Sequence, residues 1–109
     1  MAVCYILQVR VKAGYDDEFL RRYEALSERV AAGVDGHVVH QLCQGIDEPD
    51  RWLILSRWES LEASQAWDRS QEHRELTMPL RECWDEAERT GYAVRLETRR
   101  GRRNTLPTA

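Results

Sequence analysis

Long apolar runs, paired cysteines and an excess of basic residues are all missing from this 109-residue sequence. No stretch reaches the roughly eighteen apolar residues of a transmembrane helix, and the first residues lack the charged start and apolar block of a signal peptide. Three cysteines without paired spacing favour reduced thiols. We therefore expect a cytoplasmic protein that does not bind a membrane. Its length suits one domain, and 42% hydrophobic residues allow a modest core.

The net charge of −3 argues against nucleic-acid binding by the body of the domain. Basic side chains gather in residues 99–103, Arg-Arg-Gly-Arg-Arg, and the residues after them show no periodicity. We therefore expect one domain over residues 1–98. Residues 99–109 are expected to form a basic, flexible tail that is frayed or draped over a partner.

The pattern of apolar residues predicts four strands and two main helices. An apolar stripe from Phe19 to Val30 indicates an amphipathic helix, which we expect Asp16 to cap and Gly33 to end. Alternation and a high content of β-branched and aromatic residues predict strands over residues 4–11, 37–43, 52–59 and 92–98.

The segment between the third and fourth strands is expected to be helical. Ser60 is expected to cap a helix over residues 61–68, and Ser70 to cap a further turn. Pro79 is expected to interrupt the helix and to lie in the first turn of a last helical piece, which Gly91 ends.

The order β-α-β-β-α-β predicts an α+β, ferredoxin-like fold, in which both main helices cover one face of an antiparallel four-stranded sheet. In the third strand, Ile54 and its even-numbered neighbours share one face, while Leu53 and Leu55 lie on the other. Leucines on a sheet face without helices need cover from solvent. We therefore predict a homodimer whose two sheets pack face to face, a dimeric α+β barrel.

Five short motifs stand out along the chain: Val9–Gly14, Gly36–His37, Trp58–Ala63, Ala66–Trp67 and Ser70–His73. Together they resemble the antibiotic biosynthesis monooxygenase (ABM) family of dimeric α+β barrels, and the resemblance covers about residues 3–98. That family includes cofactor-independent oxygenases of aromatic polyketides, haem-degrading oxygenases and members without an assigned substrate.

The resemblance to the haem-degrading branch is incomplete. Trp67 matches the tryptophan of those proteins, but Leu7 stands where they have an asparagine. Their haem-ligating histidine falls near Leu76, a few residues after His73. Haem degradation is therefore less expected than the other activities.

Four residues are candidates for the wall of a substrate-binding pocket. Trp58 and Trp67 bury large areas as ordinary core residues, as the wall for a flat aromatic ligand, or as both. Tyr5 lies on the odd-numbered face of the first strand, which we place toward the helices. Ser56 is in phase with Trp58 and either supplies a hydroxyl to a ligand or fills space.

Two histidines are candidate catalytic residues. The imidazole of His73 is able to accept a proton from a phenol, and the competing interpretation is an exposed histidine near a helix cap. His40 either faces the pocket or is satisfied at a sheet edge or dimer interface. His37 is three residues from His40, so we expect it on the opposite face and unable to share a metal ion with it. No cysteine–histidine cluster predicts a metal site.

No glycine-rich phosphate loop, nucleophile elbow or flavin fingerprint occurs, so no organic cofactor is expected. The resemblance implies a cofactor-independent monooxygenase for an aromatic small molecule of the polyketide, anthrone or quinol type, with molecular oxygen as co-substrate. Two alternatives remain open. One is a cyclase or isomerase that uses the same base on the same barrel, and the other is a non-catalytic small-molecule-binding protein.

Overall fold

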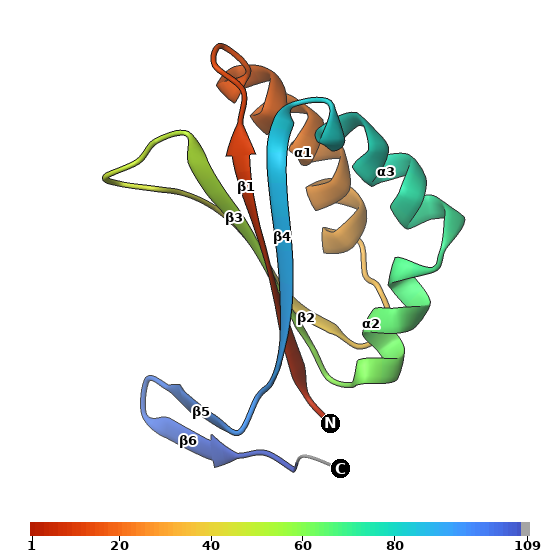
Figure 1. The fold of residues 1–109 in the computed structure, drawn as a ribbon. Helices are drawn as coiled ribbons and strands as arrows, with labels where there is room; N and C mark the ends of the chain where they lie inside the picture. Colours follow the sequence, from red (N-terminus) through yellow and green to blue (C-terminus); the bar gives the residue numbers. More distant parts are fainter. Residues whose placement is uncertain (108–109) are drawn as a thin grey trace.

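Four strands form one antiparallel sheet in the order β2-β3-β1-β4, and three helices cover one of its faces (Figure 1). The computed structural model describes residues 1–107. This arrangement confirms the predicted ferredoxin-like α+β fold, while the homodimer stays a prediction. The strands are β1 (Val3–Val11), β2 (His37–Gln44), β3 (Arg51–Trp58) and β4 (Trp84–Ala93), and the helices are α1 (Asp16–Ala31), α2 (Leu61–Asp68) and α3 (Gln71–Arg81).

The core lies between the sheet and the helices. Phe19 of α1 is fully buried, and its ring contacts the rings of Trp52 and Trp84 edge-on, with centroids 5.4 and 6.1 Å away. Val9 of β1 and Ile54 of β3 are buried in the same cluster. The odd-numbered residues of β1 and the even-numbered residues of β3 therefore face the helices, as the alternation predicted.

Two of the three predicted helix caps are correct. The hydroxyl oxygens of Ser60 and Ser70 accept hydrogen bonds from the backbone N–H groups of Ala63 and His73, each at 3.1 Å. Asp16 is not a cap, because α1 starts at this residue and the preceding cap position makes no side-chain hydrogen bond. Among residues 1–107, no helix is long and apolar enough to cross a membrane.

The fourth strand runs over residues 84–93, which corrects the predicted last helical piece and the predicted strand at 92–98. α3 continues through Pro79 to Arg81. Pro79 has no N–H group, so the last turn of α3 lacks one helix hydrogen bond. Its carbonyl also accepts a bond from Arg22 Nη1 at 2.7 Å.

A small second sheet follows β4. β5 (Leu96–Arg99) and β6 (Arg102–Thr105) form a hairpin whose turn contains Gly101 with φ +75°. Arg57 Nε donates to Glu97 Oε1 at 2.6 Å and ties this hairpin to β3, with the Arg57 side chain only 11% exposed. Residues 99–109, predicted as a tail, thus contain part of a hairpin. Thr108 and Ala109 lie outside the described residues, and the flexibility of the tail stays a prediction.

Candidate functional site

A cavity of about 540 Å³ lies between the sheet and the helices. The structure brings together around it all six residues that were singled out from the sequence, which come from three strands and two helices. Their catalytic and substrate-binding roles stay predictions. The six residues are Tyr5, His40, Ser56, Trp58, Trp67 and His73.

Indole rings form much of the cavity wall and are also part of the core. Trp58 and Trp67 are 3% and 8% exposed. The ring of Trp67 contacts the imidazole of His73 edge-on, with centroids 5.6 Å apart, and the Arg29 guanidinium lies 5.7 Å from the Trp67 ring centre. The two interpretations of these tryptophans, core and wall, therefore hold together. Such a wall suits a flat aromatic molecule.

His40 forms a hydrogen bond through Nδ1 with the Tyr23 hydroxyl of α1. Burial raises the pKa of Tyr23 to about 12 and lowers the pKa of His40 to about 4, so both groups are neutral at pH 7. We assign Tyr23 as the donor to Nδ1, because its hydroxyl has no other partner among residues 1–107. A neutral imidazole that accepts at Nδ1 carries its proton on Nε2, so with this assignment His40 offers a hydrogen-bond donor at Nε2.

His73 lines the cavity as a neutral imidazole. Burial lowers its pKa below the ordinary value of 6.5, so the imidazole is neutral at pH 7. The Asp68 carboxylate acts in the opposite direction, with its Oδ1 3.9 Å from His73 Nε2. The side chain is only 24% exposed and contributes to the cavity wall. Once His73 accepts a proton, the nearby carboxylate stabilises the positive charge.

Arg89 and Asp68 belong to the site but were missed from the sequence. The Arg89 guanidinium lies 4.1 Å from the centre of the Tyr5 ring and forms an ion pair with Asp68. Both residues line the cavity. A Cβ at Gly91 would lie 2.5 Å from Tyr5 Cε1, so the glycine leaves room for this ring. No local pattern identifies the arginine; its place follows from the pairing of odd-numbered β4 residues with odd-numbered β1 residues.

His37 and His40 lie on the same side of the sheet, which corrects the prediction that they point to opposite faces. A β-bulge between His37 and Val39 shifts the register, and the two imidazole centroids are 5.6 Å apart. The His37 ring contacts Trp58 at 4.9 Å. Within residues 1–107, no group of three or more histidine, cysteine or acidic side chains is arranged to hold a metal ion.

Replacing Tyr23 by Phe is expected to destabilise the protein by about 1 to 2 kcal/mol, because buried Nδ1 of His40 then loses its donor. Chemical denaturation measures this loss. The substitution also frees His40 to exchange its proton between the two ring nitrogens. We therefore expect the ¹⁵N spectrum of His40 to show the Nε2–H tautomer in the wild type and a mixture in Tyr23→Phe. The same spectrum in both proteins would contradict the assigned direction of this bond.

Comparisons with known proteins agree on the family. Residues 2–77 match the family described as Antibiotic biosynthesis monooxygenase. The "42.8 kDa protein in whiE locus" of Streptomyces coelicolor is 42% identical over 97 residues, which are 89% of this chain and 24% of that protein. "Polyketide synthase CurD" of Streptomyces cyaneus is 37% identical over 81 residues, 74% of this chain and 21% of that protein. The chain thus spans about a fifth to a quarter of the length of these relatives.

A solved structure shows the same fold. SnoaB of Streptomyces nogalater, described as a cofactor-independent oxygenase, superposes with a TM-score of 0.76 at 18% sequence identity. The match covers 86% of this chain and 93% of SnoaB. On the match of residues 2–77 and the identity to the two relatives, the chain belongs to the antibiotic biosynthesis monooxygenase family.

Proposed function

We propose that this protein is a cofactor-independent monooxygenase that acts on an aromatic small molecule of the polyketide, anthrone or quinol type. The observation that carries the proposal is a cavity with indole walls that holds a neutral histidine, His73, next to the carboxylate of Asp68. A relative named as a polyketide synthase and a fold neighbour described as a cofactor-independent oxygenase support the same chemistry.

The proposed reaction begins with removal of a proton from the activated carbon of an electron-rich anthrone by His73. The resulting carbanion gives one electron to dioxygen, and the carbon radical and superoxide combine to form a C–O bond. The peroxide anion takes the proton back from His73, and the hydroperoxide then loses water to leave a ketone. One dioxygen is consumed, one oxygen atom enters the product and the other leaves as water. The substrate supplies all the electrons that reduce dioxygen, so the reaction needs no cofactor as a reductant.

The other residues of the cavity position and shield the reacting molecule. The indole rings of Trp58 and Trp67 fit the flat faces of an aromatic substrate and exclude water. The Nε2–H group of His40 is assigned to hydrogen bond to the oxygen on which negative charge develops in the carbanion. Ser56 and Tyr5 offer hydroxyl groups to substituents of the ring system. These residues orient the substrate while His73 transfers the proton.

The same proposal includes a cytoplasmic homodimer. The sheet face without helices presents Leu53 and Leu55, which are only partly buried in the single chain. Covering such a face with a second copy removes apolar surface from water, which stabilises the pair.

Oxygen uptake with a hydroxylated anthrone tests the proposed activity. We expect about one dioxygen consumed for each quinone formed, as the overall reaction requires, with no added flavin or metal and no effect of a chelator. Product formation at the same rate without oxygen would instead show a cyclase or isomerase. Quenching of tryptophan fluorescence by the anthrone without turnover would show a binding protein.

A further inference from the structure

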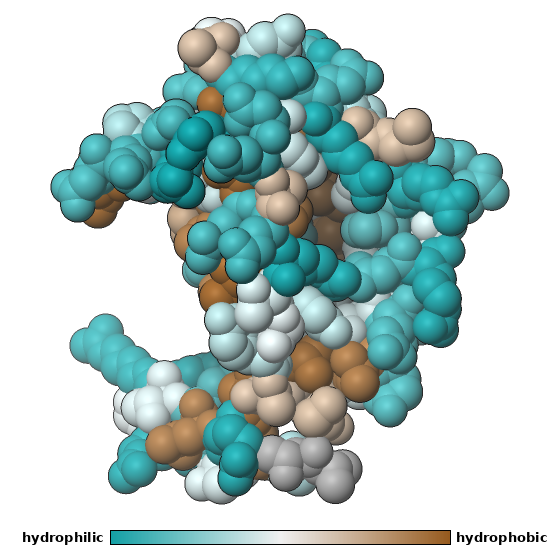
Figure 2. Space-filling model, in the orientation of Figure 1, coloured by the Kyte–Doolittle hydropathy of each residue, from teal (hydrophilic) through white to brown (hydrophobic). Residues whose placement is uncertain are grey.

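Two arms project from the sheet on the side away from the helices (Figure 1). One is the connection between β2 and β3, residues 45–50, which we name the acidic arm. The other is the β5–β6 hairpin, residues 96–105, which we name the basic arm. The arms lie at opposite ends of the strands, and the space-filling view shows an open recess between them (Figure 2).

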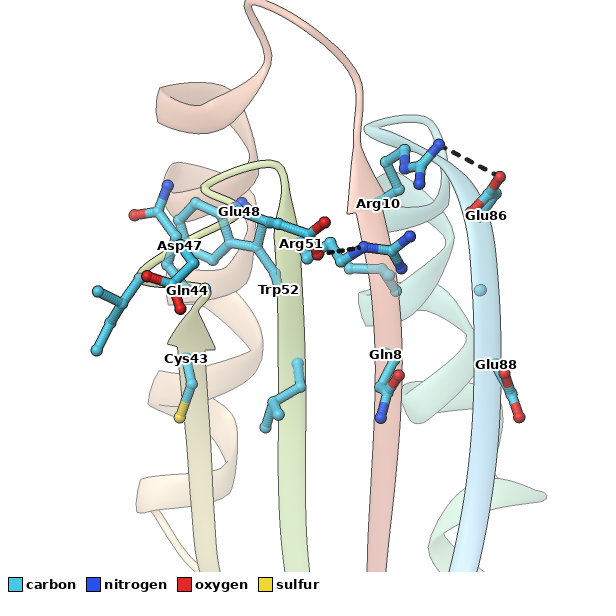
Figure 3. Close-up of a pocket in the computed structure, with 15 residues that line it drawn as sticks. Gln8, Arg10, Cys43, Gln44, Asp47, Glu48, Arg51, Trp52, Glu86 and Glu88 are labelled. Atoms are coloured by element: carbon cyan, nitrogen blue, oxygen red, sulfur yellow. Dashed lines mark ion pairs between the residues drawn. The ribbon is translucent and has the colours of Figure 1, made fainter.

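The acidic arm and the adjoining sheet enclose a hollow of about 730 Å³ (Figure 3). Asp47, Glu48, Glu86 and Glu88 line it, against Arg10 and Arg51. Both arginines are engaged within the protomer. Arg51 Nε lies 2.9 Å from Glu48 Oε2, and Arg10 lies 3.5 Å from carboxylate oxygens of both Asp50 and Glu86. Among residues 1–107, Asp47 and Glu88 have no ion-pair partner, so the hollow keeps an excess of negative charge.

The acidic arm also carries an unusual apolar side chain. Ile46 is 95% exposed, more than any other large hydrophobic residue among residues 1–107. A single exposed apolar side chain is common on protein surfaces, but Ile46 lies at the hollow and lines it. The acidic arm therefore presents both negative charge and an apolar side chain, Ile46, to a partner that binds in the recess.

The basic arm offers the opposite charge. Four exposed arginines lie in and beside its turn, and within residues 1–107 only Arg99 among them has a carboxylate nearby, Glu97 Oε2 at 3.9 Å. The partly buried Arg57–Glu97 ion pair joins the hairpin to β3, and the bond from Leu106 N–H to the Arg95 carbonyl, at 3.0 Å, closes the base of the hairpin. The basic arm is therefore positioned before any partner arrives, which lowers the entropy lost on association.

We propose that the basic arm of a second copy of this chain enters the hollow under the acidic arm, and that the contact is reciprocal. A two-fold axis along the strands would place acidic arm against acidic arm and basic against basic. An axis across the strands pairs each acidic arm with the partner's basic arm, so the charges select the second arrangement. This inference rests on the proposed homodimer but not on the proposed chemistry.

Charge reversal tests this reciprocal contact between the two arms, which we name the clasp. We expect Arg102→Glu/Arg103→Glu to raise the dimer dissociation constant at least about tenfold, and Asp47→Arg/Glu48→Arg to do the same, measured by sedimentation velocity. In each variant, both arms carry charge of one sign and repel. A chain with all four substitutions restores opposite charges and is expected to dimerise like the wild type. A mixture of the two double variants is expected to form a heterodimer.

A matched control is Arg69→Glu/Arg74→Glu, which makes the same charge change on exposed residues of the helix side. It is expected to leave dimerisation unchanged. A monomeric wild-type protein would overturn both the dimer and the clasp. A wild-type dimer that the double variants leave intact, or that the fourfold variant does not restore, would overturn the clasp alone. Oxygen uptake by the wild type reports separately on the proposed activity.

Discussion

Replacing His73 by Gln is expected to lower kcat/KM for an anthrone at least about 100-fold while the fold persists. The amide of Gln keeps a polar group in the cavity but accepts no proton at neutral pH, so it removes the base and leaves the shape. The side chain is partly exposed and its backbone N–H bonds to Ser70 Oγ, which the substitution does not change. Steady-state oxygen uptake measures the rate, and circular dichroism confirms the fold.

His37→Gln is the matched control for this experiment. His37 lies on the same side of the sheet but does not line the cavity, so its loss is expected to change kcat/KM by no more than about twofold. Equal losses in the two variants would show that His73 has only a structural role. Full activity of His73→Gln would show that His73 is not the catalytic base.

The pH dependence of kcat/KM distinguishes a base from a packing residue. Since burial lowers the pKa of His73, the base form persists to a pH below 6.5 and the acid limb lies there. Asp68→Asn removes a carboxylate that raises this pKa, so the acid limb of the variant is expected to move to still lower pH. An acid limb at the same pH in Asp68→Asn would show that Asp68 does not affect the pKa of His73.

The fold could be predicted because a strand or helix that is buried on one side carries apolar residues at a regular spacing. The alternation in β1 and β3 and the stripe on α1 face a common core, and the order of these elements leaves few topologies. β4 was not recognised because its helix-facing residues include Ala87, Arg89 and Gly91, which give no apolar alternation. Pairing with β1 determines that strand, and this tertiary contact overrides the local pattern.

The strand residues of the candidate site could be predicted from the same alternation. The prediction failed where a bulge interrupts the alternation in β2. Tyr5, Ser56 and Trp58 lie in phase on strands that the alternation identifies, so their common cavity followed from the fold. The bulge near His37 adds one residue and reverses the faces after it, which no regular period predicts. The contact of His40 with Tyr23 joins a strand to a helix and likewise has no local signal.

Lowering the pH from 6.5 to 4 is expected to reduce the free energy of unfolding by about 3 kcal/mol through His40 alone. In the unfolded chain this histidine titrates near 6.5, whereas burial keeps its pKa at about 4 in the folded protein. Between these values the unfolded state binds a proton that the folded state excludes, so stability falls as the pH falls and levels off below 4. Burial also lowers the pKa of His37 and His73, which adds loss in the same direction.

Urea denaturation of wild type and His40→Gln at several pH values, at one protein concentration, isolates this contribution. Gln keeps a neutral acceptor for Tyr23 but binds no proton in either state. The variant is therefore expected to lose less stability on acidification, and the difference between the two proteins should change by about 3 kcal/mol between pH 6.5 and 4. Parallel curves would show that His40 binds its proton equally in the folded and unfolded states, so that its pKa in the folded protein lies near 6.5 and is not lowered by burial.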